Sequence, residues 1–238
     1  MAFREGKTMK IMSFNTQHCK NFLKQEIDFE IMAKTIVDLG ADVVGLNEIY
    51  GGGTAPEFAG QTERLSELTG LKYYFFAPAI SNRNGNYGNA LISRIPIVSA
   101  ENIPIPDPED PVGAHHETRC VIKAGLENGL CVMVSHFGLN PDEQKNAASR
   151  VVKSLEGERC VFMGDLNVTP DDPVLTPIRE RMFDTAELFD GERLSFPSDK
   201  PRIKIDYIFT SPDIKAVRAD IPAVVASDHR PYVAEIEL

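Results

Sequence analysis

The stretch Val161–Pro170 (VFMGDLNVTP) constrains this chain most strongly. Three apolar residues run into Gly164, and a carboxylate at Asp165 and a carboxamide at Asn167 then stand two positions apart. Side chains alternate between the faces of a strand, so both point the same way if the strand continues. The aspartate could accept a hydrogen bond from water while the amide donates to a phosphate oxygen. The alternative is a strand followed by an ordinary Asx-Pro turn.

Other apolar runs also end on polar side chains. Residues 10–15 (KIMSFN) end on Asn15, and residues 42–48 (DVVGLNE) end on Glu48. Continuous apolar runs indicate strands that are buried on both faces. A carboxylate at the tip of such a strand is a preferred ligand of a hard cation. Further polar residues at expected strand ends are Asn89, Arg119, His136, Asp206, Asp228 and His229. Burying so many polar groups costs free energy unless they pair with one another, so we expect a shared site.

The remaining pattern predicts two β-sheets packed together with helices outside. Ile27, Ile31, Ile36 and Leu39 recur at helical spacing before a Gly40 cap. Further helices are expected over 61–68, 140–155 and 172–181, and further strands over 73–77, 87–94, 118–125, 130–136, 161–166, 204–209 and 232–237. Asn128-Gly129 predicts a hairpin turn. A turn-rich loop is expected over 81–86, and an irregular, proline-rich surface loop over 103–111.

Composition narrows the class of protein. The chain has 238 residues and a net charge of −10, and no apolar run approaches the length of a membrane span. No basic stripe is visible, which disfavours tight binding to long nucleic acids, whereas acidity suits a site for a divalent cation. We interpret residues 1–8 as an N-terminal extension, either a cloning remnant or a trimmed leader, and residues 9–238 as one domain.

The cysteines favour a reduced compartment. Cys19, Cys120, Cys131 and Cys160 have no close metal-ligand spacing, and three of them lie in apolar runs. We interpret them as small buried hydrophobic residues rather than disulfide partners. The expected location is the cytoplasm, and we expect a monomer with no membrane span and no protein partner evident from the sequence.

As a set, these motifs resemble the endonuclease/exonuclease/phosphatase superfamily, and in particular its small, bacterial-type, metal-dependent hydrolases. The matching pieces occur in the family's order and span nearly the whole chain: Ser13-Phe14-Asn15, Leu46-Asn47-Glu48, Tyr87-Gly88-Asn89, Ile92-Ser93-Arg94, Ser135-His136, Gly164-Asp165-Leu166-Asn167, Ile205-Asp206-Tyr207 and Ser227-Asp228-His229-Arg230-Pro231. The resemblance implies an α/β fold of the deoxyribonuclease I type. This is a four-layer α/β/β/α sandwich of two mainly antiparallel sheets with outer helices.

The resemblance also implies hydrolysis of a phosphate ester assisted by Mg²⁺ or Mn²⁺. Glu48 would be the main metal ligand, with Asn15 and Asp228 in or beside its shell. Asp165 and Asn167 would orient and activate the attacking water. Asp206 would hold His229 in one tautomer, and His229 could then act as a base or as a donor to phosphate. His136 would donate to a phosphate oxygen or protonate the leaving group.

Tyr87, Asn89 and Arg119 are the candidate substrate contacts. In the deoxyribonuclease branch, a glutamate at the position of Asn89 pairs with the first catalytic histidine. An amide cannot stabilise an imidazolium as a carboxylate does, so His136 is expected to be the weaker acid-base member. Specificity for double-stranded DNA is therefore not transferred to this chain.

Three further groups of residues are interpreted as structural rather than catalytic. His115-His116-Glu117 resembles a metal motif, but adjacent histidines on an extended chain face opposite sides, which favours a loop. His18 lies beyond the first strand and is not assigned to the site. Lys200, Arg202 and Lys204 form a basic cluster. A solvated loop is favoured for this cluster, and contact with a phosphorylated or polyanionic substrate is the alternative.

The leading hypothesis is a metal-dependent phosphoesterase in which water displaces the leaving group of a phosphodiester in line. The substrate would be nucleic acid or a small phosphodiester. The alternative is a phosphomonoesterase for phosphorylated sugars or inositols. The rival from another class is a binding module that keeps the fold, whose expected signature is the loss of a metal carboxylate or a histidine. Both histidines and Glu48 are present.

Overall fold

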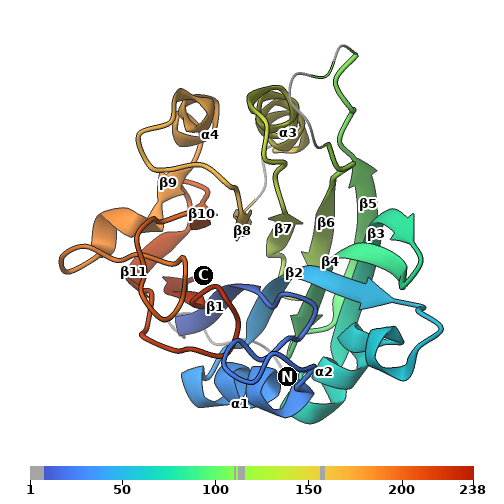
Figure 1. Ribbon diagram of the computed structural model, residues 1–238. Coiled ribbons are helices and arrows are strands. Elements are labelled where there is room, and N and C mark those ends of the chain that lie inside the picture. Colours follow the sequence, from blue (N-terminus) through green and yellow to red (C-terminus); the bar gives the residue numbers. More distant parts are fainter. Residues whose placement is uncertain (1–7, 110, 112–115, 156–158) are drawn as a thin grey trace.

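The protein consists of four layers, which Figure 1 shows edge-on in a computed structural model. The structure describes residues 8–109, 111, 116–155 and 159–238. Helices α1 (Phe29–Leu39) and α2 (Gln61–Thr69) lie beneath one sheet, and α3 (Pro141–Ser154) and α4 (Thr176–Arg179) lie above the other. The expected α/β/β/α sandwich is therefore confirmed.

Each sheet has six strands. The first has the order β11-β12-β1-β2-β4-β3, and the second β5-β6-β7-β8-β10-β9. The first contains β1 (Thr8–Asn15), β2 (Val43–Gly51), β3 (Tyr73–Asn82), β4 (Gly85–Ser93), β11 (Lys215–Asp220) and β12 (Tyr232–Glu237). The second contains β5 (Ile97–Pro104), β6 (Cys120–Leu126), β7 (Cys131–Ser135), β8 (Cys160–Asp165), β9 (Phe183–Asp184) and β10 (Asp206–Thr210). The central pairs β1–β2 and β7–β8 are parallel, and their other neighbours are antiparallel.

The helix ends follow local sequence signals. Asp28 caps α1 by accepting from the Ile31 N–H, and Gly40 closes it in a left-handed conformation with a φ of 69°. Helix α3 begins with a capping box between Asn140 and Glu143. Three short 3₁₀ turns complete the described elements, at Pro56–Phe58, Pro173–Leu175 and Thr185–Leu188.

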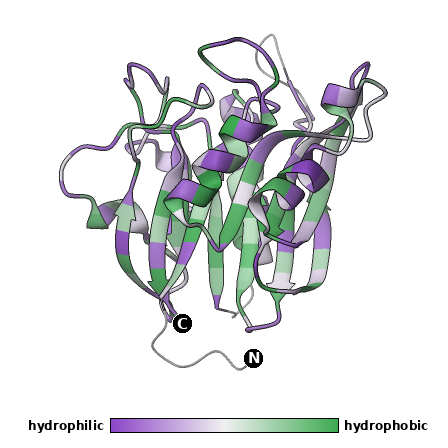
Figure 2. Ribbon diagram, turned by 90° about the horizontal axis from the view of Figure 1, so that it is seen from below, coloured by the Kyte–Doolittle hydropathy of each residue, from purple (hydrophilic) through white to green (hydrophobic). Residues whose placement is uncertain are grey.

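The core is divided because the central strands are buried on both faces. Ile11 and Met163 face the space between the sheets, whereas Met12 faces the layer of α1 and α2, and Phe162 faces α3. Alternation with period two thus assigns successive apolar residues to different cores. Figure 2 shows the result, with largely green strands in the middle and purple on the helices and on many of the loops.

Several element boundaries differ from the sequence-based prediction. The segment 97–104 is strand β5, which includes Ile103 and Pro104 from the expected irregular loop. Most of the expected 81–86 loop belongs to strands β3 and β4. The two strands form a hairpin in which Asn82 pairs with Gly85. Strand β11 was not predicted, and the expected helix over 172–181 is only one 3₁₀ turn followed by the four residues of α4. Edge strands such as β5 and β11 are half exposed, so their apolar pattern is weak.

Other expectations concern the chain's start and surroundings. Strand β1 begins at Thr8, which pairs with Glu237, so the strand starts two residues before the expected boundary at Lys10. Residues 1–7 of the proposed extension lie outside the described residues. Within the described part of the chain, no helix is both long and apolar enough to cross a membrane. All four cysteines are buried thiols, as expected.

Gly164 is expected to be indispensable for stability, because strand β8 approaches β7 closely at this point. A Cβ at Gly164 would lie 1.8 Å from the Ser135 carbonyl oxygen, and its φ is +150°. We expect Gly164→Ala to lower the free energy of unfolding by about 3 kcal/mol, measured by urea denaturation. In the control Gly129→Ala, a φ of +81° is strained but nothing lies within 4 Å, so about 1 kcal/mol is expected. Equal losses in both variants would contradict the steric argument.

Candidate active site

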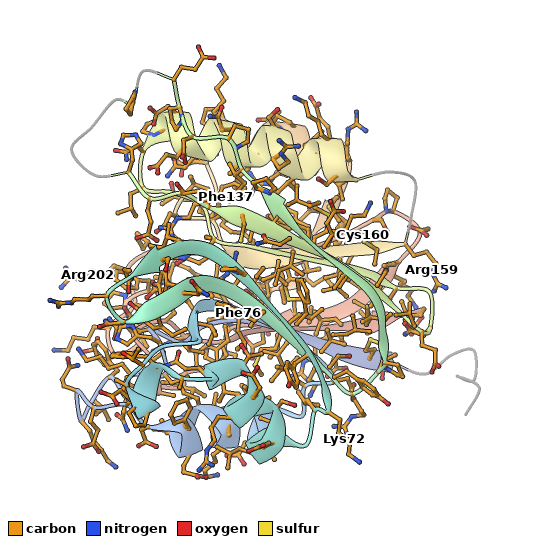
Figure 3. All side chains as sticks on the ribbon, turned by 90° about the vertical axis from the view of Figure 1, so that its right-hand side faces the viewer. Lys72, Phe76, Phe137, Arg159, Cys160 and Arg202 are labelled. Carbon is orange, nitrogen blue, oxygen red and sulfur yellow. The ribbon has the colours of Figure 1, made fainter. Side chains whose placement is uncertain are left out.

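The polar strand ends meet at one end of the sandwich. Asp165 ends β8 and pairs with Asp206 at the start of β10, while Asn15 ends β1. The Asn15 amide lies 3.0 Å from the Asp165 Oδ2 atom, although the two residues belong to different sheets. Figure 3 labels Arg159 and Cys160 at the start of β8, the end of the strand that lies away from Asp165.

A bulge in β2 presents Glu48. Register with β4 shifts between Leu46 and Ile49, and Glu48 has a φ of +60°. This conformation is uncommon for residues other than glycine, and it is held by the His18 N–H, which donates to the Glu48 carbonyl at 2.8 Å. The Asn15 amide donates to the Glu48 Oε1 atom at 3.0 Å. A carboxylate is thus turned away from the normal strand alternation and held beside Asp165.

Asp165 lies at the centre of the site with 1% of its surface exposed. Its Oδ2 atom accepts from Asn15 and lies 3.5 Å from Nε2 of both His136 and His229. Its Oδ1 atom accepts from the Asn167 backbone N–H at 3.0 Å. Burial raises the pKa of Asp165 to about 7, and the neighbouring Asp206 adds to the rise while His229 opposes it. A carboxylate in this environment is a stronger base than an ordinary aspartate.

Asp206 and His229 form a buried pair. The Asp206 Oδ2 atom lies 2.9 Å from His229 Nδ1, and both residues are nearly inaccessible. The Phe196 ring packs against the imidazole at 4.8 Å between centroids. Burial opposes a charge on His229, but Asp206 and Asp165 outweigh it and raise its pKa to about 10. The imidazolium therefore donates from Nδ1 to Asp206 and presents Nε2–H toward Asp165.

His136 has the opposite electrostatic environment. Its Nδ1 atom faces the Arg119 guanidinium at 3.2 Å, and Arg119 also donates to Glu117. A guanidinium only donates, so Nδ1 must be the acceptor and Nε2 carries the proton. Burial, Arg119 and His229 hold the pKa of His136 well below its usual value. His136 is therefore a neutral donor, consistent with the weaker acid-base role expected from sequence.

Asn167 adopts a left-handed conformation with a φ of +52°. Its Nδ2 atom donates to the Phe137 carbonyl at 3.0 Å and lies 3.1 Å from His136 Nε2. Because His136 Nε2 is protonated, the latter contact brings two donors together, and an acceptor entering the site would suit both. Asp165 and Asn167 are thus adjacent around His136, although the strand ends at Asp165 rather than continuing.

The Asn89 side chain is engaged by other residues of the sandwich. Its amide donates to the Cys120 carbonyl at 3.1 Å and accepts from Asn47 at 2.8 Å, and only 2% of the residue is exposed. Asn89 is thus used inside the sandwich, and the partner of His136 is Arg119 instead. The substrate contact expected of Asn89 stays a prediction, and its amide would have to exchange these partners to make it.

Asn47 was overlooked in the sequence. Its Oδ1 atom accepts from the Asp165 backbone N–H at 2.9 Å, and its Nδ2 atom donates to Asn89 and to the Ser135 carbonyl. The residue joins β2 to both β7 and β8, which belong to the other sheet. Its position directly before Glu48 was the signal that could have revealed it.

Glu48 and Asp228 offer the donor set expected for a hard divalent cation. Burial raises the pKa of Asp228, and the nearby charge of Glu48 contributes to the rise. Two adjacent carboxylates repel each other unless a cation or a proton intervenes, so the residues fit Mg²⁺ or Mn²⁺. Asn15 lies beside this pair, but its nitrogen donates to Glu48, so it orients the carboxylate. Tyr87 also lies near Glu48. Burial and the charges of Glu48 and Glu117 raise the pKa of its hydroxyl group.

The other residues considered in the sequence differ in how near they lie to this centre. His18 packs against Tyr50 and Phe58, its backbone N–H donates to the Glu48 carbonyl, and the charge of Glu48 also acts on its imidazole. His116 lies 3.5 Å from Asp142 at the start of α3, while His115 lies outside the described residues. Glu143, which accepts from the Glu117 N–H, is the capping residue of α3, so this group has a structural role. Of the basic cluster, Lys204 is buried and Arg202 is exposed.

Comparison with known families agrees with this geometry. The model of the Endonuclease/Exonuclease/phosphatase family matches residues 12–229, which include the strand ends from Asn15 to His229. The chain belongs to this family. It is accordingly a phosphoric ester hydrolase with a deoxyribonuclease I-like fold, and family members generally depend on divalent metals. No protein among the curated sequences matches the chain by sequence.

Solved structures show the same fold at low sequence identity. An endonuclease/exonuclease/phosphatase from Beutenbergia cavernae has a TM-score of 0.78 and 20% identity, covering 99% of this chain and 72% of its own. A mannosyl-6-phosphatase from Bacteroides thetaiotaomicron has a TM-score of 0.75 and 14% identity, covering 97% and 100%. ANGEL2, a 2′,3′-cyclic phosphatase solved with adenosine-2′,3′-vanadate, has a TM-score of 0.72 and 15% identity, covering 97% and 96%.

The tautomer of His136 can be tested by NMR. We expect nitrogen chemical shifts of a neutral imidazole with its proton on Nε2, and no protonation near pH 6.5, because burial and the charge of Arg119 lower the pKa of His136. In Arg119→Met, the pKa of His136 should rise because that charge is removed. Arg64→Met, which removes an exposed arginine, should leave it unchanged. A proton on Nδ1 in the unaltered protein would contradict the assignment.

Proposed function

We propose that the enzyme hydrolyses a phosphodiester, either in nucleic acid or in a small molecule, by in-line attack of a water oriented at Asp165. The observation that carries the proposal is the convergence of Asn15, His136 and His229 on one oxygen of a buried carboxylate. An attacking water needs a base, and the developing negative charge on phosphate needs donors. Asp165, whose pKa is raised, supplies the base for the water, and the two imidazoles supply the donors to the phosphate.

The roles follow from the charge states. His229 acts as a charged donor to a phosphate oxygen, because Asp206 holds it as an imidazolium. His136 donates from a neutral Nε2–H, and Asn167 places an amide beside it. Arg119 fixes the His136 tautomer, and Tyr87 donates to the substrate beside Glu48. Asp165 takes the proton from water as the bond between phosphorus and the leaving oxygen breaks.

Glu48 and Asp228 would hold the divalent cation, with Asn15 orienting Glu48. When bound, Mg²⁺ or Mn²⁺ would neutralise phosphate charge and stabilise the leaving oxygen. The rest of the chemistry belongs to the side chains described above. We further propose that the enzyme acts as a monomer in the cytoplasm, consistent with its four buried thiols.

A phosphomonoesterase is the second candidate. The similar fold of the mannosyl-6-phosphatase from Bacteroides thetaiotaomicron is the observation that favours it. Hydrolysis of bis-(p-nitrophenyl) phosphate and of p-nitrophenyl phosphate separates the two candidates, each measured with Mg²⁺, with Mn²⁺ and with chelator. We expect faster, metal-dependent cleavage of the diester. Cleavage of the monoester alone would favour sugar or inositol phosphates and would contradict the first candidate.

A further inference from the structure

A cavity of about 470 Å³ is lined in part by residues that flank the site residues in the chain. Its lining includes Thr169, two residues after Asn167, and Lys204, two residues before Asp206. The backbone links these segments, since the Leu166 N–H donates to the Ile205 carbonyl at 2.9 Å. The cavity is therefore reached by continuing outward along the same two chain segments that carry Asp165 and Asp206.

The cavity is lined by positive charge in an otherwise acidic protein. Arg193, Arg202 and Lys204 line it, against a single acid, Glu192, whereas the whole chain carries a charge of −10. Arg193 is paired with Asp220 at 2.7 Å. The Arg202 guanidinium has no hydrogen-bond or ion-pair partner within the described ranges and projects outward at the site end of the molecule (Figure 3).

Lys204 is unusual because its ammonium group is buried without an acceptor. Only 5% of the residue is exposed, and in the described part of the chain no hydrogen-bond partner accepts from Nζ, which lies 3.3 Å from the centroid of the Tyr207 ring. Burial lowers the pKa of Lys204 to about 7, although Asp184 and Asp206 oppose the shift. A buried ammonium costs free energy unless an anion compensates it. An anionic group in the cavity would favour its charged form.

The other walls suit the body of a small organic substrate. Phe189, Leu194 and Ile203 give the cavity an apolar lining between the cations. Ligand sites typically combine such walls with a few convergent polar groups. Lys200, the third member of the basic cluster found in the sequence, does not line the cavity.

We propose that this cavity binds a second phosphate group of the substrate, on the part of the molecule that is not cleaved, through Arg202 and Lys204. The inference rests on the proposed phosphodiesterase function and specifies its substrate class as esters that carry an additional terminal phosphate. Arg202 contacts the phosphate from the rim. Lys204 supplies charge from beneath.

Two chromogenic esters test the proposal. The p-nitrophenyl ester of thymidine 5′-phosphate is compared with the same ester carrying a 3′-phosphate, so the substrates differ only in the additional anion. We expect kcat/KM to be at least about tenfold higher for the 3′-phosphorylated ester, the factor typical of one charge-assisted hydrogen bond. Equal values for the two esters would overturn the inference while leaving the proposed function intact.

Variants of the cavity residues test whether the preference for the 3′-phosphorylated ester arises there. In Arg202→Ala, and in Lys204→Met, the ratio of the two kcat/KM values should fall toward one. Lys200→Ala removes an exposed cation from the same loop and should keep the ratio of the unaltered protein. A preference that survives both cavity variants would overturn the assignment of the site. Circular dichroism of each variant checks that the fold is retained.

A binding measurement separates this inference from the proposed function. If neither ester is cleaved, the phosphodiesterase proposal fails, and calorimetry then compares thymidine 3′,5′-bisphosphate with thymidine 5′-phosphate. Binding of the bisphosphate that is about tenfold tighter, and that depends on Arg202, would still support the cavity as a phosphate site. Equal affinities, or tighter binding that persists in Arg202→Ala, would overturn it.

Discussion

Asp165→Asn is expected to lower kcat by about 10²–10⁴-fold, the range for losing a positioned acid-base group. The substitution keeps the shape of the side chain, so the contacts with Asn15 and the Asn167 backbone can largely persist. It removes the proton acceptor on which Asn15, His136 and His229 converge. Steady-state kinetics with the diester measure the effect. Asp38→Asn, which changes an exposed aspartate on α1, serves as the matched control.

The pH profile distinguishes a base from a merely structural carboxylate. Asp165 must be ionised to accept a proton, and burial raises its pKa to about 7. Activity should therefore rise with pH through a limb well above the usual pKa of an aspartate, and level off once Asp165 has lost its proton. Asp165→Asn should lack this limb in its residual activity. An unchanged profile in the variant, or turnover close to that of the unaltered protein, would contradict the role of Asp165.

Glu48→Gln is expected to lower metal-dependent activity about a thousandfold, because a cation that stabilises phosphate charge is worth several kcal/mol. The amide retains the size of the side chain but removes the negative charge that faces Asp228. The shift in melting temperature on adding Mn²⁺ provides a second readout that does not depend on turnover. This shift should be much smaller in the variant.

The control for Glu48 is Glu63→Gln, which changes an exposed glutamate on α2. It should retain both the activity and the Mn²⁺-dependent shift. Turnover in Glu48→Gln equal to that of the unaltered protein would sink the metal assignment. A lower melting temperature of Glu48→Gln without added metal would instead indicate that Glu48 stabilises the β2 bulge.

Much of the fold was predictable because its central strands are long apolar runs. Residues such as Ile11 and Met12 serve two different cores, and this double burial leaves an unbroken hydrophobic signal. The edge strands β5 and β11 were missed because their outer faces meet solvent. The sequence predicted a loop where strands β3 and β4 pair at Asn82 and Gly85. Exposed polar residues are typical of loops, and only the structure shows that they pair.

The candidate site was also only partly predictable. The sequence placed Asp165, Asp206 and His229 together, and their ligand atoms indeed lie within 4.8 Å of one another. It could not reveal that Arg119 rather than residue 89 contacts His136, because that choice depends on which side chains face each other across sheets. Asn47 and Phe196 were missed for the same reason.

The sequence alone determined which residue types are available, in what order along the chain, and which strands must be buried. These are properties of local spacing and hydrophobicity, and the polar motifs in this order resemble those of the family. Only the tertiary structure decided the charge states. His229 is an imidazolium and His136 is neutral because one contacts a carboxylate and the other a guanidinium. Such pKa differences depend on burial and distance between segments far apart in sequence, which local patterns do not encode.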